Sequence, residues 1–191
     1  MQYVLASASP RRKQLLAELI KEFEIIPSNA DEHVEGLSPC ALVCTLAKRK
    51  AKEVAMRPEN RGKIVIGSDT VVAFCEKVLG KPVDETDAIR MLKMLSGQEH
   101  AVYTGVCLAL YTGVELRVFT AADKTAVHFE TLSDEWINAY VQGGSPMDKA
   151  GAYGIQDGGL VKKIEGSYTN VVGFPVELVK ELLERVEKEW L

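Results

Sequence analysis

Short apolar runs alternate with helically spaced apolar residues along the first half of the chain. The run at 3–6 predicts a buried strand, and the apolar residues within 15–20 then recur at helical spacing. A second helix is expected from Ser38 onward, with a buried strand at 64–66 and a hairpin over 70–79. This alternation predicts an α/β fold built on a mixed sheet.

The second half of the chain is richer in strand signals. Three β-rich runs are expected between 100 and 129, separated near Gly113 and at 121–123, as antiparallel strands. Three more helices are expected, opening at Asp84 or Thr86, at Ser133 and at Pro175. The sequence shows no repeat and no linker, and its 191 residues fit a single domain over 1–191.

Composition narrows the class of protein. The net charge of −4 argues against a general nucleic-acid binder, although local basic clusters suit an anionic small molecule. No apolar run reaches the length of a membrane span, and the N-terminus has no signal-peptide pattern, so we expect a cytoplasmic protein. Four cysteines are expected to be reduced; Cys40 and Cys44 lie one helical turn apart, which leaves a metal site as a weaker alternative.

The segment 7–12, Ser-Ala-Ser-Pro-Arg-Arg, joins the first predicted strand to the first predicted helix. Ser9 and Pro10 suit the start of a helix, whose free backbone N–H groups bind anions. Ser7 adds a hydroxyl, and Arg11 and Arg12 add bidentate donors, so the segment suits phosphate. The alternative is a capped surface helix with two solvated arginines.

Two further charged residues stand in apolar surroundings. Asp69 follows a buried run, where a carboxylate serves as a general base, as a metal ligand or as a turn cap. Lys50 falls on the apolar stripe of the second helix, so its ammonium either reaches the surface or meets phosphate in a cleft.

Three other features have lower specificity. Asp31 and Glu32 in a polar stretch are either hydrated or ligands of a hard divalent cation, and Lys81 lies in a Gly-Lys-Pro turn. The glycine-rich region 143–173 suits loops that approach a ligand closely, and within it Gln156 has the donors and acceptors to read a base. Neither a Walker A motif nor a GxGxxG motif is present.

Taken in order, these motifs resemble the Maf family of nucleotide pyrophosphatases over nearly the entire chain. The resemblance is carried by the following segments: SASPRR at 7–12, Leu46-Ala47 with Lys50-Ala51, GSDTVV at 67–72, GKP at 80–82, Ser96-Gly97, Thr104-Gly105, the 148–156 segment and EGSYTNVVGFP at 165–175. One departure is Cys75-Glu76-Lys77-Val78, where relatives often carry an Asp-Gly turn.

The resemblance implies an inosine-triphosphatase-like fold, with an elongated mixed sheet and flanking helices that form two lobes around a cleft, often as a homodimer. It also implies hydrolysis of a nucleoside triphosphate to its monophosphate and pyrophosphate, a house-cleaning activity on the nucleotide pool. Arg11, Thr70 and Gln156 match the subgroup that acts on dTTP and UTP, as opposed to the subgroup that acts on 7-methyl-GTP. Modified pyrimidine triphosphates are then further substrates.

The resemblance and the residues together lead us to expect the following roles in hydrolysis of the triphosphate. Arg12, Lys50, Lys81 and backbone N–H groups near Ser9 hold the triphosphate, with Ser7, Arg11, Thr70 and Gln156 as further substrate contacts. A divalent cation, Mg²⁺ with Mn²⁺ or Co²⁺ as alternatives, is held by Glu32 and Asp69, and Asp69 activates water. The alternatives are a nucleotide-sensing protein that affects cell division and a phosphatase that releases orthophosphate.

Overall fold

The computed structural model describes residues 1–75 and 77–190, and within them strands and helices alternate as expected. In chain order the elements are β1 (Tyr3–Leu5), α1 (Pro10–Leu19), β2 (Glu24–Ile25), α2 (Pro39–Ala55), β3 (Ile64–Phe74), β4 (Lys77–Leu79), α3 (Glu85–Leu95), β5 (Glu99–Tyr111), β6 (Leu116–Phe129), α4 (Asp134–Gln142), β7 (Val161–Glu165), α5 (Tyr168–Val172) and α6 (Val176–Glu189). Short 3₁₀ turns occupy Pro58–Asn60, Ser145–Asp148, Ala150–Ala152 and Ile155–Asp157. Glu76 of the expected hairpin and Leu191 lie outside the described residues.

A seven-stranded mixed sheet forms the centre of the molecule. Its order is β2-β1-β3-β5-β6-β7, with β4 paired to β3. β1 runs parallel to β2 and β3, and the other pairings are antiparallel. The mixed sheet predicted from the sequence is therefore confirmed.

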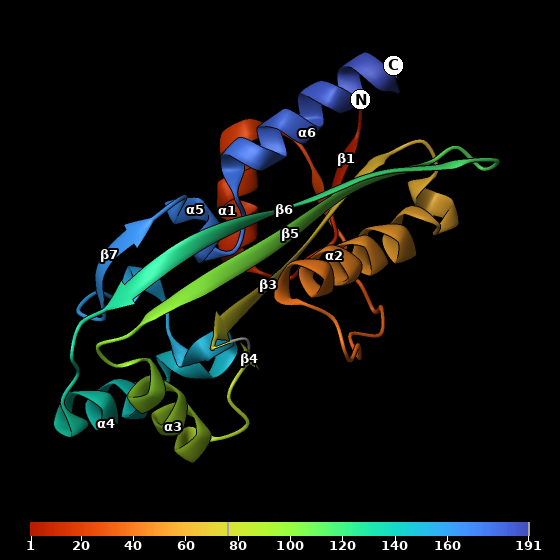
Figure 1. Ribbon diagram of the computed structural model, residues 1–191. Helices are drawn as coiled ribbons and strands as arrows, with labels where there is room; N and C mark the ends of the chain where they lie inside the picture. The colour runs from red at the N-terminus through yellow and green to blue at the C-terminus, as the bar shows by residue number, and fades with distance from the viewer. Residues whose placement is uncertain (76, 191) are drawn as a thin grey trace.

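Helices cover both faces of this sheet (Figure 1). α2 packs on one face through Ala47, Ala51 and Val54. α1 and α6 pack on the opposite face, where Leu16 and Val179 join the same apolar cluster. α3 and α4 lie together at one end of the sheet (Figure 1), over a third apolar cluster.

Two glycines allow α2 to lie directly on the sheet. A Cβ added at Gly105 would come within 2.3 Å of the Val43 carbonyl oxygen, and one added at Gly67 within 2.5 Å of the Ala47 carbonyl oxygen. Since real Cβ atoms do not approach that closely, a side chain at either position would push the helix away. This close packing determines the height at which Lys50 of α2 stands above β3.

The structure corrects several sequence expectations. The region 100–129 forms two long strands instead of three, because residues 121–123 pair with residues 104–106 of β5 without a break. Tertiary pairing here overrides the low strand propensity of alanine and aspartate. The hairpin expected over 70–79 is present, because residues 72–74 of β3 pair antiparallel with residues 77–79 of β4. Its first strand is the end of the long β3, however, so Asp69 lies in the middle of a strand and not at its end. Of the two possible caps for α3, Asp84 is the one used, because its side chain accepts a hydrogen bond from Asp87 N at 2.7 Å.

Candidate active site

A cleft of about 770 Å³ opens beside β3, where the shorter β1 stops. Leu5 of β1 pairs with Ile66, and beyond this point the edge of β3 faces the turn that leads into α1. All ten residues expected to bind substrate or metal or to catalyse line this cleft: Ser7, Ser9, Arg11, Arg12, Glu32, Lys50, Asp69, Thr70, Lys81 and Gln156. The volume is in the range of small-molecule sites.

The turn between β1 and α1 is organised by its own serines. The Ser9 side chain caps α1 by accepting a hydrogen bond from Arg12 N at 3.4 Å, and Pro10 occupies the first turn of the helix. Ser7 Oγ accepts from Ser9 N at 3.2 Å. The helix start predicted at Ser9-Pro10 is confirmed, and it lines the cleft.

Arg12 is more deeply engaged in the fold than the sequence suggests. Its guanidinium donates to the carbonyls of Ser68 at 2.7 Å and Gly173 at 3.0 Å, and to the hydroxyls of Thr70 at 3.2 Å and Ser7 at 3.5 Å. Burial lowers the pKa of Arg12, while the negative charge of Asp69 acts in the opposite direction. Four of its contacts thus go to the protein, which leaves one of its five N–H donors for a phosphate oxygen.

Lys50 reaches down from α2 and joins the two candidate carboxylates. Its Nζ lies 2.6 Å from Asp69 Oδ1 and 3.0 Å from Glu32 Oε1. The Lys50 and Asp69 side chains are only 12% and 11% exposed, whereas that of Glu32 is 61% exposed. A buried carboxylate with one oxygen held by an ammonium keeps its other oxygen for water or a cation.

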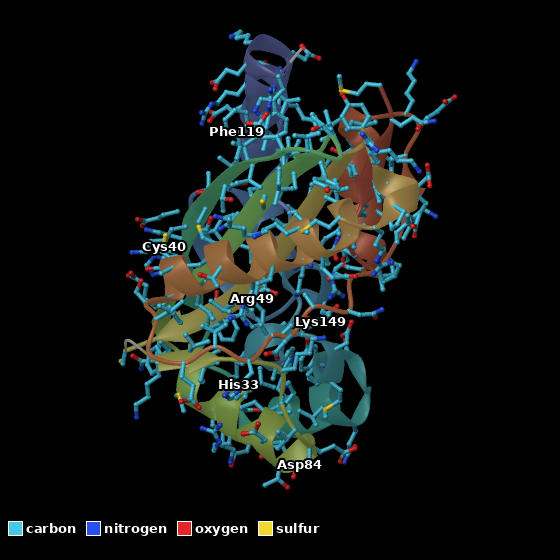
Figure 2. All side chains as sticks on the ribbon, turned by 90° about the vertical axis from the view of Figure 1, so that its right-hand side faces the viewer. His33, Cys40, Arg49, Asp84, Phe119 and Lys149 are labelled. Atoms are coloured by element: carbon cyan, nitrogen blue, oxygen red, sulfur yellow. The ribbon has the colours of Figure 1, made fainter. Side chains whose placement is uncertain are left out.

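The segment that carries Glu32 is tied to α2. Glu53 of α2 accepts hydrogen bonds from Ser28 Oγ at 2.9 Å and Asn29 N at 3.0 Å. Arg49 donates to the carbonyls of Asp31 at 3.1 Å and His33 at 3.0 Å. Figure 2 shows Arg49 on α2. In this view the segment that carries His33 passes below the helix, and Lys149 also lies below it. Glu32 therefore has a defined place near Asp69, with the Lys50 ammonium between the two carboxylates.

The carboxylates of Glu32 and Asp69 fit a divalent cation of the kind that protein carboxylates and substrate phosphates bind together. Mg²⁺ is commonly bound by one or two carboxylates together with substrate phosphates, and Glu32 and Asp69 provide two carboxylates at one wall of the cleft. Within residues 1–75 and 77–190 no group of three or more His, Cys, Asp or Glu could hold a metal ion. The cysteine alternative is therefore not supported there; Cys40, Cys44, Cys75 and Cys107 are free thiols.

The opposite wall comes from the glycine-rich region and includes residues that were not singled out from the sequence. Lys149 Nζ contacts Asp148 Oδ1 at 2.8 Å and the Ser145 carbonyl, and Arg11 reaches Asp148 Oδ2 at 3.3 Å. Although burial opposes it, Lys149 and Arg11 hold the pKa of Asp148 below its ordinary value. In the sequence, the feature that points to Lys149 as a site residue is its position in the glycine-rich region 143–173.

Lys81 and Gln156 are both exposed at the rim of this wall. The turn that carries Lys81 is attached to the glycine-rich region by a hydrogen bond from Gly151 N to the Gly80 carbonyl, at 3.0 Å. Gln156 lies in the 3₁₀ turn Ile155–Asp157. Thr70 is placed differently, because its Oγ1 contacts Thr104 Oγ1 at 3.0 Å as well as Arg12. The three residues linked to pyrimidine selectivity thus line one cleft, with Thr70 at its floor on β3.

Comparison with known proteins finds relatives over nearly the whole chain. The chain is 51% identical over 183 residues to the dTTP/UTP pyrophosphatase of Thermococcus onnurineus (strain NA1), covering 95% of this chain and 96% of the relative. It is 49% identical over 187 residues to the protein of the same name from Carboxydothermus hydrogenoformans, covering 96% of this chain and 98% of the relative.

The fold is also found among solved structures. The Staphylococcus aureus Ham1 protein aligns with a TM-score of 0.52 at 12% identity, over 97% of this chain and 99% of that one. This likeness supports the expected inosine-triphosphatase-like architecture. No helix in the described part of the chain is long and apolar enough to cross a membrane.

The family model described as "Maf-like protein" matches residues 2–186, which is nearly the whole chain. Most of the motifs on which the sequence resemblance depends contribute residues to the cleft, whereas Ser96-Gly97 and Thr104-Gly105 are not among its lining residues. The chain belongs to the Maf family.

Proposed function

We propose that this protein is a nucleoside triphosphate pyrophosphatase that hydrolyses dTTP and UTP, and modified pyrimidine triphosphates, to the monophosphate and pyrophosphate. The observation that carries the proposal is that one cleft is lined both by a carboxylate paired with a lysine and by a capped helix N-terminus. Relatives at 51% and 49% identity are named dTTP/UTP pyrophosphatase, which supports both the reaction and the substrates. The nucleotide-sensing alternative is not favoured, since these relatives are named as enzymes.

The triphosphate binds along the basic side of the cleft. Lys50, Lys81 and the first turn of α1 supply positive charge and N–H donors there. Arg12 contributes its remaining N–H and keeps the α1 turn on β3. The base lies toward the opposite wall, where Gln156 has both a donor and an acceptor for the edge of uracil or thymine.

Asp69 accepts a proton from water, which attacks the α-phosphorus as the bond to the bridging oxygen breaks and pyrophosphate leaves. Lys50 donates to Asp69 Oδ1 and so positions this carboxylate in the cleft. A divalent cation, Mg²⁺ or alternatively Mn²⁺ or Co²⁺, would be held by Glu32 and Asp69 and would offset charge on the phosphates.

The test is product analysis with Mg²⁺ and a panel of dTTP, UTP, CTP, GTP and 7-methyl-GTP. Pyrophosphate together with dTMP or UMP supports the proposal. Orthophosphate as the first product would support the phosphatase alternative, and binding without turnover would support the sensing protein. A cytoplasmic location, where the nucleotide pool lies, and a single domain over 1–191 stay predictions.

We also infer a homodimer, which the open edge of β6 supports. Residues 116–125 pair with β5 on one side, while β7 joins the other side only at Ala126–Phe129 within the described chain. Antiparallel pairing of two copies about Thr120 would set Arg117 of each copy opposite Asp123 of the other.

Charge reversal tests this interface. Arg117→Asp alone should dissociate the dimer, and adding Asp123→Arg should restore it, as measured by sedimentation. A monomeric wild type, or a dimer that is insensitive to Arg117→Asp, would contradict the inference.

A further inference from the structure

The ammonium of Lys50 occupies the space between the two carboxylates that would hold a cation. Its Nζ contacts both Asp69 Oδ1 and Glu32 Oε1, and both contacts are 3.0 Å or shorter. The two carboxylates come from different segments, Asp69 from β3 and Glu32 from the segment before α2. Lys50 is the group that links them.

This arrangement opposes metal binding in the absence of nucleotide. Two carboxylates alone are a weak site for a hard divalent cation, which ordinarily takes six or more oxygen ligands. Here their charge is already partly balanced by Lys50, and an incoming cation would meet that ammonium at short range. Because the Lys50 side chain is 12% exposed, water screens the repulsion less than it would at the surface.

A triphosphate changes this balance. It brings several negative charges and additional oxygen ligands into the same cleft. The flexible four-carbon stem of lysine allows its ammonium to move from a carboxylate to a nearby phosphate oxygen. The carboxylates would then be available to hold the cation, and Lys50 would be available to the phosphates.

We propose that Lys50 acts as a placeholder cation, which occupies the Glu32–Asp69 pair until nucleotide enters, so that the metal binds only together with nucleotide. The proposal rests on the proposed function, since it takes the cleft to be a triphosphate site. It assigns Lys50 a second role besides phosphate binding: it prevents the empty site from binding free metal.

The test measures binding of Mn²⁺ alone, without nucleotide, by electron paramagnetic resonance of the free ion. Wild-type protein should bind Mn²⁺ weakly, and Lys50→Met, which keeps the stem and removes the charge, should bind it at least about tenfold more tightly. Lys48→Met is the matched control, because Lys48 is exposed on the same helix, and it should behave as wild type. Adding Asp69→Asn to Lys50→Met should abolish the gain.

Equal Mn²⁺ affinity in wild type and Lys50→Met would overturn the proposal, as would an equal gain in Lys48→Met. If Lys50→Met does not fold, Lys50→Gln provides the same comparison with a polar side chain. Failure of the proposed function is seen separately: a mixture of wild type and a non-hydrolysable dTTP analogue would then bind no more Mn²⁺ than the two do when measured apart, whatever the variants do. If the wild type hydrolyses dTTP but Lys50→Met binds Mn²⁺ no more tightly than the wild type, only the placeholder role of Lys50 is contradicted.

Discussion

Arg12 Nε donates a hydrogen bond to the carbonyl of Gly173 at 3.0 Å, although the two residues are 161 positions apart in the chain. The same guanidinium donates to Ser68 on β3 at 2.7 Å. One side chain therefore joins the β1–α1 turn, the central strand and the turn before α6. Arg12 holds together the three segments that form the floor of the cleft.

Replacing Arg12 with lysine should lower the free energy of unfolding by about 2–4 kcal/mol, because the carbonyls of Ser68 and Gly173 would lose well-aligned donors. Urea denaturation measures this loss. The control is Arg11→Lys, since Arg11 makes an ion pair with a 64% exposed Asp148 and should change stability by less than about 1 kcal/mol. Equal stability of both variants would show that Arg12 is not a structural clamp.

Asp69→Asn should lower kcat by about 10²–10⁴-fold, because the amide cannot accept the proton of water at neutral pH. Folding should be retained, since Asn keeps an oxygen for Lys50. Steady-state kinetics together with thermal denaturation test both statements. Asp31→Asn is the control, because Asp31 is 79% exposed and should not affect turnover. Full activity of Asp69→Asn would exclude Asp69 as the base.

Gln156→Glu should reduce the preference for dTTP and UTP over CTP by about tenfold or more in kcat/KM, because a carboxylate only accepts hydrogen bonds and is left facing the carbonyl oxygens of uracil. Competition between UTP and CTP measures the ratio directly. Gln98→Glu, on an exposed turn, serves as the control. An unchanged ranking of substrates would remove Gln156 from base recognition.

His100 should make stability depend on pH. It is 4% exposed, and burial, followed by the nearby charge of His128, lowers its pKa from 6.5 to about 4. Below pH 6.5 the imidazole of His100 binds a proton in the unfolded chain but not in the folded protein. The contribution of His100 to the free energy of unfolding is therefore fully present above pH 6.5 and is lost as the pH falls toward 4.

The expected loss from this residue is about 2 kcal/mol between pH 7 and pH 5. Urea denaturation of wild type and His100→Gln at both values measures it, because the difference between the two proteins isolates the imidazole. Between pH 7 and pH 5, the free energy of unfolding of His100→Gln should fall by about 2 kcal/mol less than that of the wild type. Parallel losses would contradict the assignment.

Much of the site was accessible from the sequence because its chemistry lies in short local motifs. The cap at Ser9, the lysine on the apolar stripe of α2 and the carboxylate of Asp69 each depend on neighbours a few residues away. The structure brings them to the same cleft, as expected.

The remaining features depend on contacts between distant segments. Whether Arg12 faces phosphate or Gly173 is decided by the packing of α1 against the turn before α6. The continuity of β6 through residues 121–123 follows from its pairing with β5, and the position of Asp69 in mid-strand follows from the length of that same partner. No local pattern of hydrophobic residues contains this information.

The most direct test of the proposed reaction is hydrolysis of dTTP in H₂¹⁸O, with the label located by mass spectrometry of the products. Attack of water at the α-phosphorus places one ¹⁸O in dTMP and none in pyrophosphate, which is the predicted result. Label in pyrophosphate, or release of labelled orthophosphate, would show that water attacks another phosphorus and would contradict the proposed reaction.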